Sequence, residues 1–281
     1  MAKIIVGIHG LANKPEAATL AKWWRQSIAE GLSKNCGLRN HGFEFEMVYY
    51  ADVFYSRPVP AQKNDEPYVK AKAGALRRYD EGFFDFLGDK VEEVIGLGLD
   101  EIKQQLGFTT KLIDRGLKKV LSDLGRYYLK EQDRATVRER LRQVLEDHHD
   151  KEILLIAHSM GSIVAYDVLR QLGRDANPPM AVSRLATIGS PIGLAHVKRK
   201  MQLEWGRRLR TPSVVSKSWS NFADRRDYVA LDAHLRDDYR ANSTGIRVHD
   251  DRVCNDYPDN PHKSYGYLRT PEFSEYVADF L

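Results

Sequence analysis

Cysteine is scarce in this chain. Only Cys36 and Cys254 occur among its 281 residues, far apart and outside any C-x-x-C spacing. This scarcity excludes a disulfide framework and a zinc site built from cysteine pairs.

Long apolar runs are also missing. The run at 4–8 is too short for the core of a signal peptide, and no stretch approaches the roughly 18 apolar residues of a membrane span. The sequence therefore predicts a soluble protein of a reducing compartment, the cytoplasm.

Net charge is low as well. The 43 lysines and arginines exceed the 39 aspartates and glutamates by a small margin, which gives a formal charge of +4. Most of the excess lies in residues 196–210, which contain the bases Lys198, Arg199, Lys200, Arg207, Arg208 and Arg210 and the acid Glu204. Outside this stretch the charges nearly balance, so no nucleic-acid partner is expected for the chain as a whole. An electrostatic partner is expected at this segment alone.

Extremes of composition are absent too. With 42% hydrophobic and 29% charged residues, 20 glycines and 11 prolines, the chain has the usual composition of a globular protein. Collagenous and disordered proteins are therefore excluded. The length suits one large α/β domain or two small domains, and either could bury a sizeable core.

Apolar patterns predict strands that alternate with helices. Short runs rich in β-branched and aromatic residues predict strands at 4–8, 43–50, 153–157, 183–188, 214–222 and 246–249. Apolar residues at helical spacing predict helices at 20–32, 134–148, 160–172 and 270–281. Such alternation implies crossover connections, and therefore an α/β fold with a mostly parallel central sheet flanked by helices.

Residues 54–130 interrupt this rhythm because they contain no convincing strand. Instead they contain FFDFLG at 83–88, with Phe83, Phe84 and Phe86, and apolar residues at helical spacing, notably Ile113, Leu117, Val120, Leu124 and Tyr128. This pattern predicts a helical, lid-like insertion after the second strand, within a single domain that spans residues 1–281. The alternative is a longer pair of crossover helices packed on the core.

The most informative segment is 153–169, in which a buried strand leads through Ala157-His-Ser159-Met-Gly161 into a helix. In a small-x-Ser-x-Gly turn between strand and helix, the serine is exposed at the carboxyl end of the sheet, and small flanking residues keep the tight turn free of clashes. Ala157 stands where glycine is usual, and alanine has the next-smallest side chain. Ser159 is thus the candidate nucleophile. A serine that only caps the helix is the structural alternative.

Backbone N–H groups near Ser159 predict an oxyanion hole. Met160 begins the helix, where N–H groups have no partner within the helix. A second donor is expected in the turn after the first strand, where Gly10 lets the backbone approach and present the N–H of Leu11 or Ala12. His9 is expected to brace this turn rather than to transfer a proton.

A serine nucleophile needs a neighbouring base, and four histidines follow it in the chain. We favour His262, because it lies in a loop between the last predicted strand and the final helix, from which it could reach the carboxyl edge of the sheet. His249 lies within a predicted strand, and His234 lies in a polar, helical stretch. His196 belongs to the basic segment.

The base in turn needs an orienting carboxylate. Asp224 and Asp227 both follow the end of the strand at 214–222. We favour Asp227, since the D-x-V arrangement lets a loop aspartate project into the site while Val229 anchors the loop. Asp224 remains the alternative acid.

Taken together, HG at 9–10, AHSMG at 157–161, DYV at 227–229 and NPHKSYGYL at 260–268 resemble the α/β hydrolases of the lipase/esterase type. The resemblance covers residues 1–53 and 131–281. It implies a nucleophile at Ser159, a general base and then acid at His262, and an orienting carboxylate at Asp227, with no cofactor and no metal. Only three residues precede the first predicted strand, so the antiparallel strands that usually open such a sheet are not expected here, and the position after the second strand is uncommon for a lid.

The resemblance implies a serine hydrolase that cleaves a carboxylic ester through an acyl-enzyme. The apolar insertion favours a lipid or acyl ester as the small-molecule substrate. Thioesterases, amidases and acyltransferases use the same parts, and the sequence does not separate them. The rival hypothesis is a non-catalytic, hydrolase-like binding protein that presents the insertion or the basic segment to a partner. The sequence makes no prediction of oligomeric state.

Two further patterns have a structural and a functional interpretation. Within the basic segment, Val197, Met201, Trp205 and Leu209 recur every four residues, which predicts an amphipathic helix with cationic flanks. Its outer face is either merely solvated or makes peripheral contact with an anionic membrane or a phosphate-bearing substrate. The pair at 148–149 does not predict a metal site, because adjacent helical residues point about 100° apart.

Overall fold

The computed structural model describes residues 1–39, 41–64, 67–71, 74, 76–79, 125–174, 180–230 and 232–281. The apolar patterns at 83–88 and 113–124, on which the prediction of a lid-like insertion rests, lie outside the described residues. A short helix, α2 (Ala51–Phe54), leads into the predicted insertion. Within the insertion, the structure describes a 3₁₀ turn, η1 (Ala61–Lys63), and a helical segment at 125–129 that contains Tyr128.

Six strands form one parallel sheet in the order β2-β1-β3-β4-β5-β6. Their bounds are β1 (Lys3–Ile8), β2 (Glu44–Val48), β3 (Glu152–His158), β4 (Val182–Ile188), β5 (Val215–Ala223) and β6 (Val248–Arg252). Because every neighbouring pair is parallel, the carboxyl ends of all six strands lie along one edge of the sheet. The predicted α/β class with a parallel sheet is confirmed.

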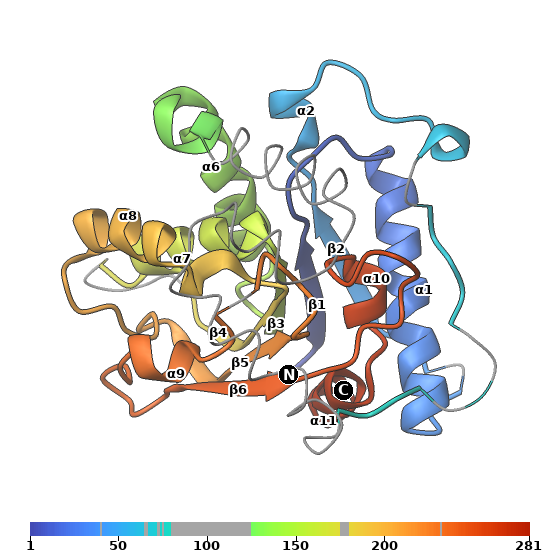
Figure 1. The fold of residues 1–281 in the computed structure, drawn as a ribbon. Coiled ribbons are helices and arrows are strands. Elements are labelled where there is room, and N and C mark those ends of the chain that lie inside the picture. Colours follow the sequence, from blue (N-terminus) through green and yellow to red (C-terminus); the bar gives the residue numbers. More distant parts are fainter. Residues whose placement is uncertain are drawn as a thin grey trace, which may run out of the picture.

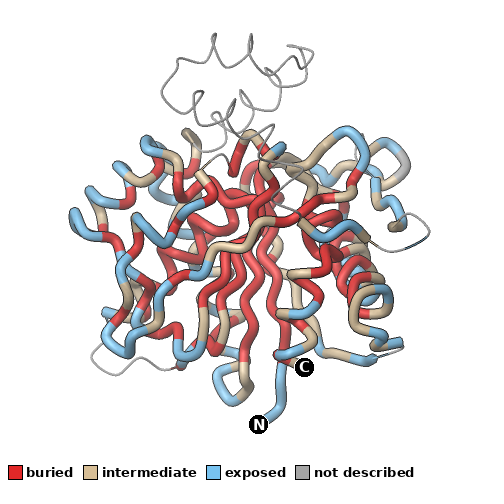
Figure 2. Tube along the Cα trace, turned by 60° about the horizontal axis from the view of Figure 1, so that its bottom comes forward, coloured by how far each residue is buried: buried red, intermediate tan, exposed pale blue. Residues whose placement is uncertain are grey.

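Helices cover both faces of this sheet (Figure 1). On one face pack α6 (Glu131–Asp147), α7 (Met160–Leu172) and α8 (Ala195–Trp205), and on the other α1 (Ala17–Asn35), α10 (Ser264–Tyr267) and α11 (Pro271–Phe280). The four inner strands, β1, β3, β4 and β5, are largely buried, whereas the edge strands β2 and β6 are partly exposed (Figure 2). In β1, Ile4, Val6 and Ile8 face the first layer while Ile5 faces the second, as the alternation of a strand requires.

The last strand differs most from its predicted bounds. It begins at Val248 instead of Ile246, because Asn242 holds the preceding residues in a loop. The Ile246 N–H donates to Asn242 Oδ1 at 2.9 Å, and the Asn242 N–H donates to the Ile246 carbonyl at 2.9 Å. These bonds occupy the backbone groups that a longer strand would have used. Two short elements flank the sheet edge, η3 (Pro191–Gly193) and α9 (Leu235–Asp238).

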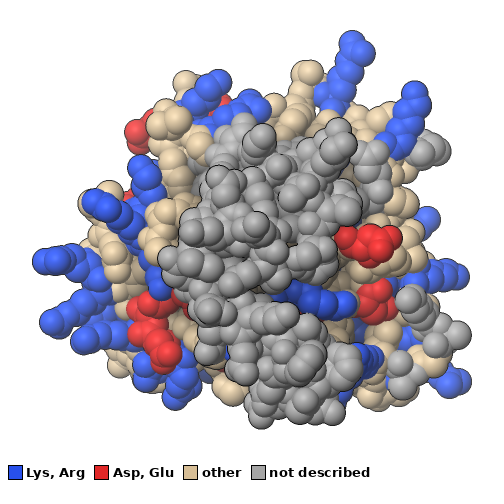
Figure 3. Space-filling model, viewed as in Figure 1, with Lys and Arg blue, Asp and Glu red and all other residues tan. Residues whose placement is uncertain are grey.

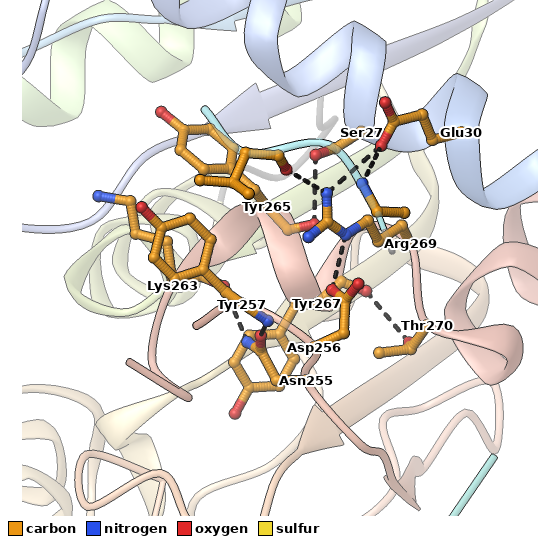
Figure 4. A network of polar contacts seen from close by, with 12 residues as sticks. Ser27, Glu30, Asn255, Asp256, Tyr257, Lys263, Tyr265, Tyr267, Arg269 and Thr270 are labelled. Carbon is orange, nitrogen blue, oxygen red and sulfur yellow. Dashed lines mark hydrogen bonds and ion pairs between the residues drawn. The ribbon is translucent and has the colours of Figure 1, made fainter. Parts of the chain in front are cut away.

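A buried arginine ties the chain after β6 to α1 (Figure 4). Arg269 is 1% exposed, and its guanidinium donates to Asp256 Oδ1 at 2.6 Å and to Glu30 Oε2 at 3.3 Å. It also donates to the Val69 carbonyl. A buried cation with two carboxylate partners is costly to disrupt, since either carboxylate would lose its counter-charge. The network therefore fixes the segment on which α10 and the preceding loop are built.

No helix among the residues that the structure describes is both long and apolar enough to cross a membrane.

Candidate active site

Ser159 lies in a tight turn between β3 and α7, at the carboxyl edge of the sheet. Its backbone has φ of 54° and ψ of −127°, a conformation that residues other than glycine rarely adopt. Such a conformation costs on the order of 1–3 kcal/mol and persists only where the surroundings enforce it. Here the buried strand and the buried helix on either side enforce it.

Two glycines let the chain approach this turn. A Cβ at Gly161 would lie 2.6 Å from the His9 carbonyl oxygen and 2.7 Å from that of Ile8. A Cβ at Gly10 would lie 2.6 Å from Ser159 Cβ. These distances are shorter than any tolerated contact, and at Gly161 the obstacle is backbone that cannot move aside. The sequence requirement for small residues here thus has a direct steric cause.

The structure brings Ser159, His262 and Asp227 together. His262 Nε2 lies 2.9 Å from Ser159 Oγ, and His262 Nδ1 lies 2.8 Å from Asp227 Oδ2. Both partners of the imidazole are almost fully buried, Ser159 at 2% exposure and Asp227 at 0%. The imidazole therefore connects a hydroxyl to a buried carboxylate, an arrangement suited to passing a proton from the serine to the histidine.

Sequence reasoning missed a third partner of the carboxylate, Tyr267. Its hydroxyl donates to Asp227 Oδ2 at 2.7 Å, the same oxygen that faces His262, and accepts the Asp224 N–H at 3.0 Å. The other oxygen, Asp227 Oδ1, accepts the N–H of Val229 at 2.9 Å. Burial, reinforced by Asp227 and Asp224, raises the pKa of Tyr267 well above its usual value, so the hydroxyl stays protonated and remains a donor.

Asp224, the alternative acid, faces away from the histidine. Its Oδ2 accepts the Asn255 N–H at 2.6 Å and an N–H of Arg226 at 2.6 Å, and its Oδ1 accepts the Arg226 N–H at 2.8 Å. Both oxygens are therefore used in joining the loop after β5 to the chain after β6. The two aspartates have separate surroundings although only two residues stand between them.

The loop that carries His262 is held by hydrogen bonds that its backbone carbonyl groups accept. The side-chain amide of Asn255 donates to the carbonyls of Pro261 and Lys263, each at 2.8 Å. His158 Nε2 donates to the carbonyl of His262 at 2.8 Å. The carbonyls of residues 261–263 thus accept hydrogen bonds from two side chains, His158 at the end of β3 and Asn255 in the chain after β6. We call Asn255 and His158 the loop clamp, and the sequence patterns did not reveal it.

His9 holds the turn after β1 in a defined tautomer. The Tyr50 N–H donates to His9 Nε2 at 3.0 Å, and a backbone N–H can only donate, so the ring proton lies on Nδ1 and is donated to the Gly10 carbonyl at 2.7 Å. Burial and the neighbouring Lys14 lower the pKa of His9 to about 3, which keeps the ring neutral. Because carbonyl and N–H point in opposite directions across a trans peptide, this contact also orients the N–H of Leu11.

His158 is likewise neutral, because burial and the nearby His262 lower its pKa well below the usual value. Neither His9 nor His158 is therefore available as a cation at neutral pH.

The predicted oxyanion donors belong to the two segments that meet at Ser159. Met160 is the first residue of α7, directly after Ser159, and is fully buried. Leu11 follows Gly10 in the turn that contacts Ser159, and is also buried. The adjacent Ala12 has a φ of 68°, so this turn, like the serine turn, holds a non-glycine residue in the left-handed region.

The remaining histidines considered as bases lie elsewhere. His234 precedes α9 and His249 lies in β6, and both are exposed, as is His196 on α8. His148 caps the end of α6 and contacts Glu46 Oε2 at 2.6 Å. In the part of the chain that the structure describes, no group of three histidine, cysteine, aspartate or glutamate side chains could hold a metal ion.

Residues 127–211 match the model of a family described as an alpha/beta hydrolase of unknown function (DUF900). A search of curated proteins found none that matches the chain. The matched residues include the turn at Ser159, whereas Asp227 and His262 follow the matched part. The match and the parallel sheet confirm the predicted resemblance to the α/β hydrolases and the α/β-hydrolase fold, and they support a hydrolase in general.

Proposed function

We propose that this protein is a serine hydrolase that cleaves a carboxylic ester through an acyl-enzyme on Ser159. One observation carries the proposal: His262 stands between the other two groups, 2.9 Å from Ser159 Oγ and 2.8 Å from Asp227 Oδ2. A serine hydroxyl is a weak nucleophile without such a base, and a base is misoriented without such a carboxylate.

The reaction has two stages, acylation of Ser159 and hydrolysis of the acyl-enzyme. His262 Nε2 takes the proton from Ser159 Oγ as the oxygen attacks the ester carbonyl, and Asp227 stabilises the imidazolium that forms. The tetrahedral oxyanion accepts hydrogen bonds from the N–H groups of Met160 and Leu11. His262 then gives its proton to the leaving alcohol oxygen, and the acyl group remains on Ser159. Water, deprotonated by the same imidazole, releases the acid and restores the serine.

The neutral state of His9 and His158 supports the assignment of His262 as the general base. His9 and His158 both have pKa values lowered by burial, and both donate their ring proton to backbone carbonyls. They are therefore occupied with holding the two loops that meet at Ser159. His262 is the histidine whose ring contacts the serine oxygen.

Within carboxylic esters, we propose a lipid or acyl ester as the preferred substrate. This part rests on the apolar sequence of residues 83–124, and a chain-length series tests it. Nitrophenyl esters of increasing acyl length should be turned over faster as the chain grows. Equal rates for short and long chains, with no response to lipid vesicles, would remove the lipid preference and leave the esterase proposal intact.

The test of the proposed activity is labelling by an active-site-directed fluorophosphonate. Wild-type protein should be labelled and Ser159→Ala should not. Ser162→Ala is the matched control, since Ser162 lies one turn further along α7 and bonds to Ser190 Oγ instead of a histidine. Equal labelling of wild-type and Ser159→Ala protein would refute the proposal. Absence of both labelling and turnover across esters and thioesters would favour the non-catalytic binding protein.

A further inference from the structure

Helix α8 presents a cationic face on the outside of the molecule. Its inner face packs into the core through Val197, Met201 and Trp205. The outer face and the turn that follows expose Arg199, Lys200, Arg207, Arg208 and Arg210. We call these five residues the cationic face. Figure 3 shows lysine and arginine side chains projecting at the left edge, on the side of the molecule where α8 lies in Figure 1.

The acidic side chains that the structure describes near α8 do not neutralise the cationic face. Glu204, the acid of α8, turns inward to Arg138 and Arg134, which also bind the buried Asp167. Lys198 turns toward Asp232, which precedes α9, and Asp238, which ends it, and these bind Lys198 at 3.2 Å and 2.6 Å. Among the described residues, no carboxylate forms an ion pair with Arg199, Lys200, Arg207 or Arg208.

Basic residues of neighbouring segments extend the positive charge of the cationic face. Arg210 pairs with Arg240 in an isolated parallel β-bridge, and both side chains are exposed. Arg174, exposed after the end of α7, stacks over the Trp205 ring at 4.5 Å. Cations from three separate segments therefore gather around α8.

Two other surface helices of this protein place charges of opposite sign together. On α6, Arg142 pairs with Glu146 one turn later. On α11, the exposed Glu275 pairs with Arg78. A solvated helix face is satisfied by such mixtures, so a face of one sign needs a different explanation.

An exposed leucine lies within the cationic face. Leu203 is 78% exposed, although the apolar positions of α8 on either side of it in sequence, Met201 and Trp205, are buried. An apolar side chain surrounded by guanidinium and ammonium groups suits a surface that is anionic outside and apolar beneath. It offers nothing to a nucleic-acid base, which binds aromatic rings or hydrogen-bonding side chains.

We propose that the cationic face docks on a bilayer that contains anionic phospholipid, with Leu203 entering the headgroup region. The basic side chains bind lipid phosphate and carboxylate groups, and each cation near such a surface contributes roughly a fivefold factor in affinity at low salt. The leucine adds contact with the acyl boundary. The cationic face includes none of the residues placed at the site, so its role does not rest on the proposed hydrolase activity.

Vesicle co-sedimentation with the full-length Ser159→Ala protein tests the proposal, because this variant is not expected to hydrolyse lipid during the assay. We expect binding to vesicles of two parts phosphatidylcholine to one part phosphatidylserine, weak binding to phosphatidylcholine alone, and release at high salt. Replacing Arg199, Lys200, Arg207 and Arg208 by glutamine should weaken binding at least about tenfold. Leu203→Ser should weaken it about threefold or more.

The matched control replaces four exposed cations on the other side of the sheet, Lys22, Arg25, Arg39 and Lys70, by glutamine. It removes the same charge and should leave vesicle binding within about twofold of the parent, if position matters rather than net charge. Circular dichroism should show that both quadruple variants are folded. The proposal is overturned if the two variants lose binding equally, if Leu203→Ser binds like the parent, or if the parent binds single-stranded RNA or duplex DNA and not the anionic vesicles.

Discussion

Two loops meet at Ser159, and they are held by opposite means. The serine turn is held by packing: a backbone with positive φ stands between a buried strand and a buried helix, with glycines where any side chain would collide. The loop of His262 is held by hydrogen bonds, from the amide of Asn255 and the ring of His158 to three consecutive carbonyls. Asp227, the carboxylate partner of His262, also accepts a hydrogen bond, from Tyr267. The first loop depends on shape and the second on hydrogen bonds.

This difference separates two kinds of failure. A side chain added to the serine turn damages packing and folding together. A change in the contacts of the histidine loop should leave the fold nearly intact and displace one imidazole. Because a displacement of about 1 Å can cost about 100-fold in rate, the second loop is where activity should be most sensitive at constant stability.

The largest effect is expected at the carboxylate. Asp227→Asn should lower kcat/KM for a nitrophenyl ester by about 10³- to 10⁴-fold, because an amide would stabilise the wrong tautomer of His262. Asp224→Asn is the matched control, since this aspartate is equally buried but bonds to Arg226 and Asn255. The kcat/KM of Asp224→Asn should stay within about tenfold of the wild-type value, while the variant loses about 1–3 kcal/mol of unfolding free energy. The reverse ranking would make Asp224 the catalytic acid.

A smaller loss is expected from the loop clamp. Asn255→Asp replaces an amide donor with a carboxylate that repels the carbonyls of Pro261 and Lys263, so kcat should fall about 10- to 100-fold. Asn242→Asp offers a close control, because the Asn242 amide also donates to two carbonyls, those of Pro212 and Val215, away from the site. Both variants should lose stability in urea, but only the first should lose kcat by more than about tenfold. Equal kcat values would show that the clamp has no positioning role.

Tyr267→Phe should change the pH profile more than the rate. Without the hydroxyl, Asp227 Oδ2 keeps a fuller negative charge facing His262, and the imidazolium form is favoured. The acid limb of the kcat/KM profile should therefore move to higher pH, with less than about a tenfold loss at its plateau. Tyr166→Phe, whose hydroxyl donates to the Arg210 carbonyl, removes a comparable buried bond and should leave the profile unmoved. An unshifted profile for Tyr267→Phe would mean that the tyrosine is purely structural.

The last prediction concerns the pH dependence of stability and not the rate. In the unfolded chain His9 takes up a proton near pH 6.5, but in the folded protein only near 3. Between these values the unfolded state binds more protons, so stability falls as pH falls, by up to about 1.4 kcal/mol per pH unit, and this contribution is constant above about 6.5. His158 acts in the same direction. Urea unfolding of wild type and His9→Gln from about pH 7 to about pH 4 should show a shallower slope in the variant. Parallel slopes would contradict the assignment of His9 as a buried neutral histidine.

Much of the fold could be predicted because its signals are local. The six strands follow from short apolar runs, and α1, α6, α7, α8 and α11 follow from apolar residues at helical spacing. The turn at Ser159 follows from small residues between a strand and a helix. The short helix α10 lies where the sequence predicts a loop. The start of β6 could not be predicted, because the two bonds that keep Ile246 out of the strand are made by the side-chain oxygen and the backbone N–H of Asn242, and no apolar pattern expresses them.

The candidate site was only partly predictable for the same reason. Asp227 and Asp224 follow the same strand and are both buried, and what distinguishes them is which one meets a loop more than thirty residues further along the chain. Tyr267 lies within the quoted segment NPHKSYGYL, but the segment assigns it no role, and Asn255 belongs to none of the quoted motifs. Their contacts depend on how α10 and the chain after β6 pack on the sheet, and no spacing in the sequence expresses that packing.

The central claim is that Ser159 carries an acyl group during turnover. The most direct measurement is mass spectrometry of protein quenched during hydrolysis of a short-chain nitrophenyl ester, followed by digestion to locate the adduct. The account predicts one acyl group on the peptide that contains Ser159 in wild-type protein, and none in Ser159→Ala. An acyl group on another residue, or turnover retained by Ser159→Ala, would contradict it.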